Sequence, residues 1–214
     1  MAGATPVQPV LIVVAGPNGS GKTTLTARLK QDHWSEGVEY LNPDDIARDR
    51  FGNWNSPEAV LAAARWTENR REQLLRDGAG IAFETVLSAP DKLQFLQRAR
   101  AAGYFVRAFF VGTSNPAINA ARVAARLMEG GHQVPIEKIV ARYSRSLANL
   151  SVLSRIAQRT YVYDNSVDGE DARLCARFQD GLLRKLYADP PAWVMETCGH
   201  AARHSQFEDL RPTP

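Results

Sequence analysis

The sequence predicts a three-layer α/β fold built around a parallel sheet of about five strands. Short strand-like runs alternate with helical patterns along the chain, as in successive βαβ units. Glycine and proline signals separate these runs. An apolar content of 44% over 214 residues provides enough core for one domain. We expect that domain at residues 1–188, followed by an irregular, proline-rich tail at residues 189–214.

The expected strands are short runs rich in apolar residues. The first is β-branched and shows no alternation, which indicates burial on both faces. The second ends at Asn42-Pro43-Asp44, where a proline and an acidic residue open a loop. The strands are predicted at residues 10–14, 38–41, 80–84, 104–111 and 159–163.

Local signals mark the ends of the helices. Ser56 is a good N-cap, and Gly78 is a good terminator for the long helix between them. Ser88 and Asp91 form a capping-box pattern, and Asn115 precedes a proline that can begin a helix. The helices are expected from Ser56 to Gly78, from Ser88 to Gly103, from Asn115 to about Glu129, and from a break at 130–135 to about Ala157.

Composition narrows the class of protein. Lysine and arginine number 26 against 23 acidic residues, a net charge of +3 that is too small to indicate a nucleic-acid partner. Two cysteines provide no disulfide framework, which suits a reducing compartment. The apolar run at residues 9–15 is too short to span a membrane. We therefore expect a cytoplasmic protein that binds neither nucleic acid nor membrane.

A glycine-rich turn lies between the first strand and the first helix. Residues 16–23 read Gly-Pro-Asn-Gly-Ser-Gly-Lys-Thr and match the phosphate-binding P-loop pattern in its required context. The glycines let successive amides converge on phosphates, and the helix N-terminus adds partial positive charge. Lys22 is predicted to reach the β- and γ-phosphates, and the Thr23 hydroxyl to bind Mg²⁺.

Nucleotide binding alone does not fix the reaction, because GTPases, motor ATPases and small-molecule kinases share this loop. No Asn-Lys-x-Asp segment of the GTPase type follows a late strand. The third strand ends at Phe83-Glu84-Thr85 and lacks the paired acids of ring-forming ATPases. These observations favour a kinase.

Four motifs in order resemble the zeta-toxin family of P-loop kinases. They begin at residues 16, 42, 83 and 130, the last reading Gly-Gly-His-Gln-Val-Pro, and the resemblance covers about residues 10–165. The family is similar in fold to chloramphenicol phosphotransferase and has a helical lid. The resemblance implies ATP-dependent phosphorylation of a hydroxyl of UDP-N-acetylglucosamine or a related nucleotide sugar, with an antitoxin protein as a partner. The residues expected to bind ATP are Gly16, Pro17, Asn18, Gly19, Ser20, Gly21, Lys22, Thr23 and Thr24.

The resemblance assigns the acceptor side of the site to two strand ends. Asp44 matches the general base, and Asn42 is expected to contact the acceptor with it. The alternative for Asp44 is a helix cap, with Asp45 beside it. Glu84 and Thr85 match substrate contacts, although the well-known toxins place one residue between them. Glu84 could instead organise the magnesium shell through water.

Arginines of the lid region are expected to hold the transferring phosphoryl group. Arg122 matches the first family arginine, and Arg126 lies one turn further along the same helix face. His132 replaces the second family arginine. The alternative for both arginines is a solvated helix surface.

Two further features leave alternatives open. Arg142 lies on a basic helix face that either borders the cleft and binds the substrate or is simply solvated. Asp164-Asn165 either flanks the adenine pocket or caps a turn. For the whole protein, the competing hypotheses are a kinase of another metabolite or antibiotic without toxicity, and a non-catalytic, nucleotide-gated binding module.

Overall fold

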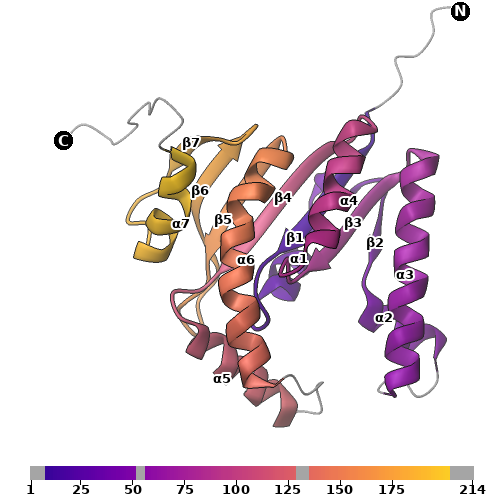
Figure 1. Ribbon diagram of the computed structural model, residues 1–214, viewed down its shortest axis with the longest axis horizontal. Coiled ribbons are helices and arrows are strands. Elements are labelled where there is room, and N and C mark those ends of the chain that lie inside the picture. The colour runs from indigo at the N-terminus through magenta and orange to yellow at the C-terminus, as the bar shows by residue number, and fades with distance from the viewer. Residues whose placement is uncertain (1–7, 52–55, 129–134, 203–214) are drawn as a thin grey trace, which may run out of the picture.

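The computed structural model describes residues 8–51, 56–128 and 135–202, which form one twisted sheet with helices on both faces (Figure 1). Within these residues the sheet has seven strands in the order β2-β3-β1-β4-β5-β6-β7. The first five in chain order are parallel, as the sequence predicts. They are β1 (Val10–Ala15), β2 (Val38–Leu41), β3 (Gly80–Thr85), β4 (Phe105–Gly112) and β5 (Arg159–Asp164).

Two antiparallel strands extend the sheet beyond the prediction. Strands β6 (Arg173–Gln179) and β7 (Leu182–Leu186) form a hairpin at the β5 edge. Their connection is Asp180-Gly181, with φ of 50° and 81°. Two successive residues with positive φ match the two-residue turns that twist with the strands of a hairpin. An Asp-Gly pair was therefore a local signal for these two strands.

The helices lie unequally on the two faces of the sheet. Helices α3, α4, α6 and α7 lie in front in Figure 1, and α1 lies behind β1. Residues 11–15 of β1 are all buried because both faces are covered at this central strand. The helices are α1 (Lys22–Leu29), α2 (Pro43–Arg50), α3 (Pro57–Asp77), α4 (Pro90–Ala101), α5 (Pro116–Met128), α6 (Ile136–Ile156) and α7 (Ala192–Ala202), with a 3₁₀ turn at His33–Ser35.

Most of the predicted helix ends are confirmed. The Ser56 hydroxyl accepts a bond from the Ala59 amide, and Gly78 ends α3 with φ of 66°. The Asn115 carboxamide oxygen accepts a bond from the Ala117 amide at 2.8 Å. The capping box at Ser88 is wrong, because α4 begins after Ala89 and no side chain caps it. Pro90, which has no amide hydrogen, removes one donor that such a cap would satisfy.

The segment expected to be an irregular tail contains helix α7. The Trp193 side chain is 5% exposed, and its indole nitrogen donates to Asp164 Oδ1 at 2.7 Å. A Cβ added to Gly112 would come within 2.4 Å of that indole ring, so the helix packs closely on the end of β4. The prolines at 190 and 191 precede the helix and do not prevent it. Among the described residues, no helix combines the length and apolarity that a membrane span requires.

Candidate active site

The glycine-rich turn joins β1 to α1 at the carboxyl edge of the parallel strands. Its three glycines have positive φ, of 146° at Gly16, 74° at Gly19 and 95° at Gly21. A Cβ at Gly16 would lie 2.0 Å from the Val111 carbonyl oxygen. The loop therefore requires glycine there for space as well as for backbone conformation. Two polar atoms of the loop, Asn18 Oδ1 and Ser20 Oγ, are buried and have no hydrogen-bond partner among the described residues.

Lys22 is the cation of this loop. Its ammonium donates to the Pro17 carbonyl at 2.9 Å, so it is folded back over the loop. The surrounding protein lowers the pKa of Lys22 to about 8, chiefly by excluding water, while Glu84 raises the pKa and Arg126 lowers it. Lys22, Glu84 and Arg126 thus lie close enough to influence one another.

We expect the affinity for ATP to be independent of Lys22 ionisation well below pH 8 and to fall as the pH rises through about 8. A phosphate needs the protonated lysine, so the loss should approach about tenfold per pH unit once Lys22 is neutral. Calorimetry in two buffers of different ionisation heat should record proton uptake on binding at pH 9. Without nucleotide, stability should rise from pH 8 towards 10.5, because the unfolded chain keeps the proton in that range. A pH-independent affinity with no proton uptake would contradict the lowered pKa.

The carboxylate of Glu84 connects the loop to the second strand. It accepts bonds from the Thr23 hydroxyl at 3.2 Å and from the Tyr40 hydroxyl at 2.9 Å. Burial raises the pKa of Tyr40, and the Glu84 carboxylate raises it further, so the phenol stays a donor. A hydroxyl and a carboxylate side by side are hard oxygen ligands of the kind that Mg²⁺ prefers. The residues present therefore fit a magnesium ion at Thr23, with Glu84 beside it.

Asp44 lies at the beginning of α2, directly after β2. The Asn42 carboxamide oxygen caps this helix by accepting from the Asp44 amide at 3.0 Å. Asn42 is the N-cap and Asp44 lies within the first turn with an exposed side chain, so Asp44 is not the helix cap that was one alternative for it. Because β2 and β3 are parallel neighbours with Leu41 opposite Phe83, Asp44 after β2 and Glu84 near the end of β3 lie at one edge of the sheet.

Thr85 is turned away from a substrate role. Its side chain is 9% exposed, and its hydroxyl accepts from the Leu87 amide at 3.0 Å. Leu87 is buried and has φ of 56°, an unusual conformation that this bond and a second one stabilise. The second runs from the Asn149 carboxamide to the Leu87 carbonyl at 2.8 Å. Thr85 thus holds the turn after β3, in contrast to the expected contact with the acceptor.

A cavity of about 230 Å³ opens beside the glycine-rich turn. It lies between α1, α5 and the loop that follows β5. The lining residues are Gly19, Gly21, Thr24, Leu25, Arg28, Arg122, Arg126, Asn165 and residues 167–172. Its position at the end of the phosphate loop and its mixed polar and apolar lining suit a nucleoside.

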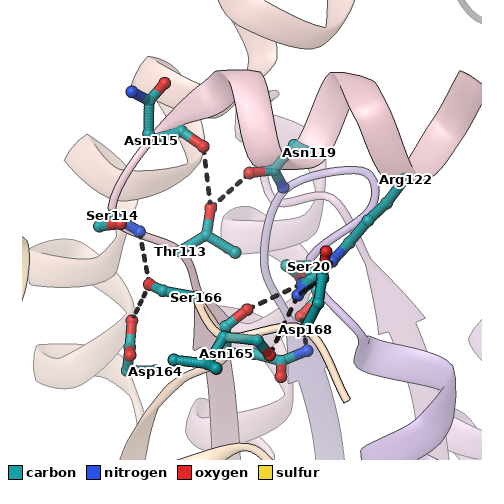
Figure 2. A network of polar contacts seen from close by, with 11 residues as sticks. Ser20, Thr113, Ser114, Asn115, Asn119, Arg122, Asp164, Asn165, Ser166 and Asp168 are labelled. Atoms are coloured by element: carbon teal, nitrogen blue, oxygen red, sulfur yellow. Dashed lines mark hydrogen bonds and ion pairs between the residues drawn. The ribbon is translucent and has the colours of Figure 1, made fainter. Parts of the chain in front are cut away.

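Two arginines of α5, Arg122 and Arg126, line this cavity and differ in their contacts. Arg122 reaches the loop after β5, where its guanidinium bonds the Asn165 carbonyl at 2.8 Å and pairs with Asp168 at 2.5 Å (Figure 2). Arg126 is exposed and lies near enough to Lys22 to lower its pKa. The predicted phosphate contacts of both arginines remain predictions; here Arg122 is bonded to the loop after β5, whereas Arg126 lies near Lys22.

Two predicted residues lie apart from this arrangement. Arg142 is half-buried on α6 and is not among the residues that line the cavity. His132 lies outside the described residues.

Sequence reasoning missed several residues of the site. They are Arg28 and residues 167–172 around the cavity, Tyr40 at Glu84, and Asn119 at the glycine-rich turn. Asn119 is separated from its partner Asn18 by 101 positions, so no local pattern marks it. For Asn165, the prediction near the nucleoside pocket agrees with its place in the cavity lining.

A glycine-rich loop with its lysine, a strand-end acid beside its threonine and a nucleoside-sized cavity define a P-loop kinase site. The family model described as zeta toxin matches residues 3–170. The chain therefore belongs to the zeta toxin family of P-loop kinases.

Two curated proteins are similar to parts of this chain. An uncharacterised protein of Haemophilus influenzae is 28% identical over 132 residues, which cover 62% of this chain and 91% of that protein. A uridine kinase of Deinococcus deserti is 48% identical over 44 residues, 21% of each chain.

Two solved structures share the fold. A chain of the PezAT chromosomal toxin-antitoxin system of Streptococcus pneumoniae has a TM-score of 0.60 at 16% identity, covering 97% of this chain and 83% of that one. A chain of the AvrRxo1-ORF1:-ORF2 complex with ATP has a TM-score of 0.64 at 18% identity, covering 94% and 66%.

Proposed function

We propose that this protein transfers the γ-phosphate of ATP to a hydroxyl of UDP-N-acetylglucosamine or a related nucleotide sugar. The observation that carries the proposal is the placement of Asp44 and Glu84 at adjacent strand ends, with Glu84 bonded to Thr23 of the phosphate loop. The Asp44 carboxylate is exposed to solvent and makes no bond within the part of the chain that the structure describes, which suits the acceptance of a proton. The zeta toxin family supports the acceptor, and the ATP-bound AvrRxo1 structure supports the donor.

In this mechanism the protein mainly positions the two substrates and neutralises the charge of the phosphates. Lys22 leaves the Pro17 carbonyl and binds the β- and γ-phosphates. Arg126 faces the same phosphates from α5 and stabilises charge that develops on the transferring group. Asp44 accepts the proton of the acceptor hydroxyl as that oxygen bonds to the γ-phosphorus and the bond to ADP breaks. Thr23 and Glu84 would hold Mg²⁺, which supplies charge neutralisation across the β- and γ-phosphates when bound.

The test is a transfer assay with γ-labelled ATP, with and without Mg²⁺. The acceptor panel contains nucleotide sugars, free sugars, uridine and other nucleosides, and aminoglycosides. We expect label on UDP-N-acetylglucosamine or a close analogue, and only with Mg²⁺. Label on uridine alone would show that the acceptor is a nucleoside. A nucleoside is the second candidate because of the short match to a uridine kinase. No transfer by protein that binds ATP would support the nucleotide-gated module and reject the kinase reaction.

We further propose that this protein is a cytoplasmic toxin and that an antitoxin protein is its partner. The PezAT structure describes a toxin-antitoxin system, and the AvrRxo1 structure is a complex of two proteins. Two buried free cysteines, Cys175 and Cys198, suit a reducing compartment. Growth arrest on expression that requires Asp44 would support toxicity.

A further inference from the structure

Two asparagines outside the glycine-rich motif bond its backbone from two sides. The Asn119 carboxamide nitrogen donates to the Asn18 carbonyl at 2.6 Å, and the Asn165 carboxamide nitrogen donates to the Ser20 carbonyl at 2.8 Å. Asn119 comes from α5, and Asn165 directly follows β5. The loop is thus held by side chains that lie about a hundred residues or more away in the sequence.

These bonds fix the direction in which two loop amides point. In a trans peptide the carbonyl and the following amide point in opposite directions, and no cis peptide occurs in the described residues. A carbonyl of Asn18 turned towards Asn119 therefore turns the Gly19 amide away from α5. The same argument turns the Gly21 amide away from Asn165. Within the described residues, neither glycine amide donates to a protein acceptor, so both remain available to an anion.

The first brace, which is the bond from the Asn119 side chain to the Asn18 carbonyl, is held in place by buried neighbours. Asn119 is fully buried, and its other amide atom accepts from the hydroxyl of Thr113, which is also fully buried. The Thr113 carbonyl in turn accepts from the Tyr143 hydroxyl at 2.6 Å. A Cβ at Gly19 would lie 2.6 Å from the Asn119 carbonyl oxygen, so loop and helix touch. The orientation of the Asn119 carboxamide is therefore determined by its neighbours on both sides.

The second brace, which is the bond from the Asn165 side chain to the Ser20 carbonyl, is linked to Arg122 through the Asn165 backbone. The Asn165 carbonyl accepts from the Arg122 guanidinium while its side chain bonds Ser20 (Figure 2). Asn119 and Arg122 lie three positions apart on α5 and share a face with Arg126. The glycine-rich turn, α5 and the loop after β5 thus form one closed hydrogen-bonded circuit.

We propose that Asn119 and Asn165 are positioning residues for triphosphate binding, which act by aiming the Gly19 and Gly21 amides into the phosphate site. The inference rests on the nucleotide-binding half of the proposed function and is independent of the acceptor. A phosphate group would be recognised by amides that are already aligned, so little ordering remains to be done on binding. Loss of a brace would leave a loop carbonyl unpaired and let its peptide rotate.

The experiment compares Asn119→Leu with Gln158→Met. Leucine is close in shape to asparagine, and methionine to glutamine. Each change removes a carboxamide that donates one hydrogen bond and accepts another. Gln158 bridges the Tyr104 carbonyl and the Val106 amide at the opposite end of β4, away from the loop. We measure dissociation constants for ATP, inorganic tripolyphosphate and adenosine, together with the melting temperature. Asn165→Ala serves as the second variant, because Asn165 is only half-buried and tolerates change better.

We expect Asn119→Leu to weaken ATP and tripolyphosphate by the same factor, roughly tenfold or more, and to leave adenosine unchanged. Gln158→Met should lower the melting temperature without affecting either phosphate ligand. Equal ATP affinity in wild type and Asn119→Leu, or equal losses in Asn119→Leu and Gln158→Met, would overturn the inference. If Asn119→Leu does not fold, tripolyphosphate binding by Asn165→Ala decides. Wild-type protein that fails to bind ATP would reject the proposed function itself, a separate outcome.

Discussion

Replacement of Asp44 by asparagine is expected to lower kcat about 10²- to 10⁴-fold, the usual contribution of a general base. The affinity for ATP should not change, because Asp44 lies at the start of α2, away from the residues that line the nucleotide cavity. The helix cap should survive, since it uses the Asp44 amide and the Asn42 side chain. The measurement is steady-state transfer to the best acceptor of the panel, with ATP binding followed separately.

Asp45→Asn is the matched control for this change. Asp45 is the next residue of the same helix and pairs with Arg48 at 3.6 Å on a partly exposed surface. Such a surface pair contributes little to stability, so kcat should stay within about twofold of wild type. A large loss in Asp45→Asn with full activity in Asp44→Asn would move the general base to Asp45. Full activity in both variants would remove α2 from the chemistry.

The parts of the fold that the sequence predicts are those with local causes. The buried run of β1 and the glycine pattern after it each lie within a few residues, and both are found where expected. Strand β6 does not stand out in the sequence because Arg173 and Arg177 interrupt its apolar residues, and Asp180-Gly181 is its main local signal. The proline-rich composition before α7 favours irregular structure, but Pro190 and Pro191 directly precede its first turn, a place where proline favours a helix.

The candidate site shows the same division. Lys22 and Thr23 follow from a contiguous motif, whereas the bond from Thr23 to Glu84 depends on how segments 61 positions apart meet. Asn119 bonds a carbonyl 101 positions away, and a carbonyl carries no side-chain signature in the sequence. The resemblance to the zeta-toxin family implies that Thr85, at the end of β3, contacts the acceptor. Its hydroxyl instead satisfies the turn at Leu87, a backbone conformation that no sequence pattern reveals.

Arg126 and Arg122 should respond differently to the same substitution. Arg126→Met is expected to lower kcat about 10²- to 10³-fold with a small change in KM for ATP, the usual cost of losing one donor that stabilises transition-state charge. The reason is its position, exposed in the nucleotide cavity and close to Lys22. No described protein group holds its guanidinium, so the residue is free to follow the phosphoryl group as charge develops.

Arg122→Met should instead raise KM for ATP with a smaller effect on kcat. Its guanidinium already binds the Asn165 and Val167 carbonyls and pairs with Asp168, so it supports the wall of the nucleoside cavity. The Arg122 side chain supports this loop in the ground state and in the transition state alike. Its removal should therefore weaken the binding of both states equally. Arg122 and Arg126 lie one turn apart on α5, so each variant is the control for the other when kcat and KM are compared. A kcat effect on Arg122 that matches or exceeds that on Arg126 would return the phosphoryl contact to Arg122. It would also imply that the bonds to Asp168 and Asn165 are exchanged for bonds to phosphate when nucleotide binds.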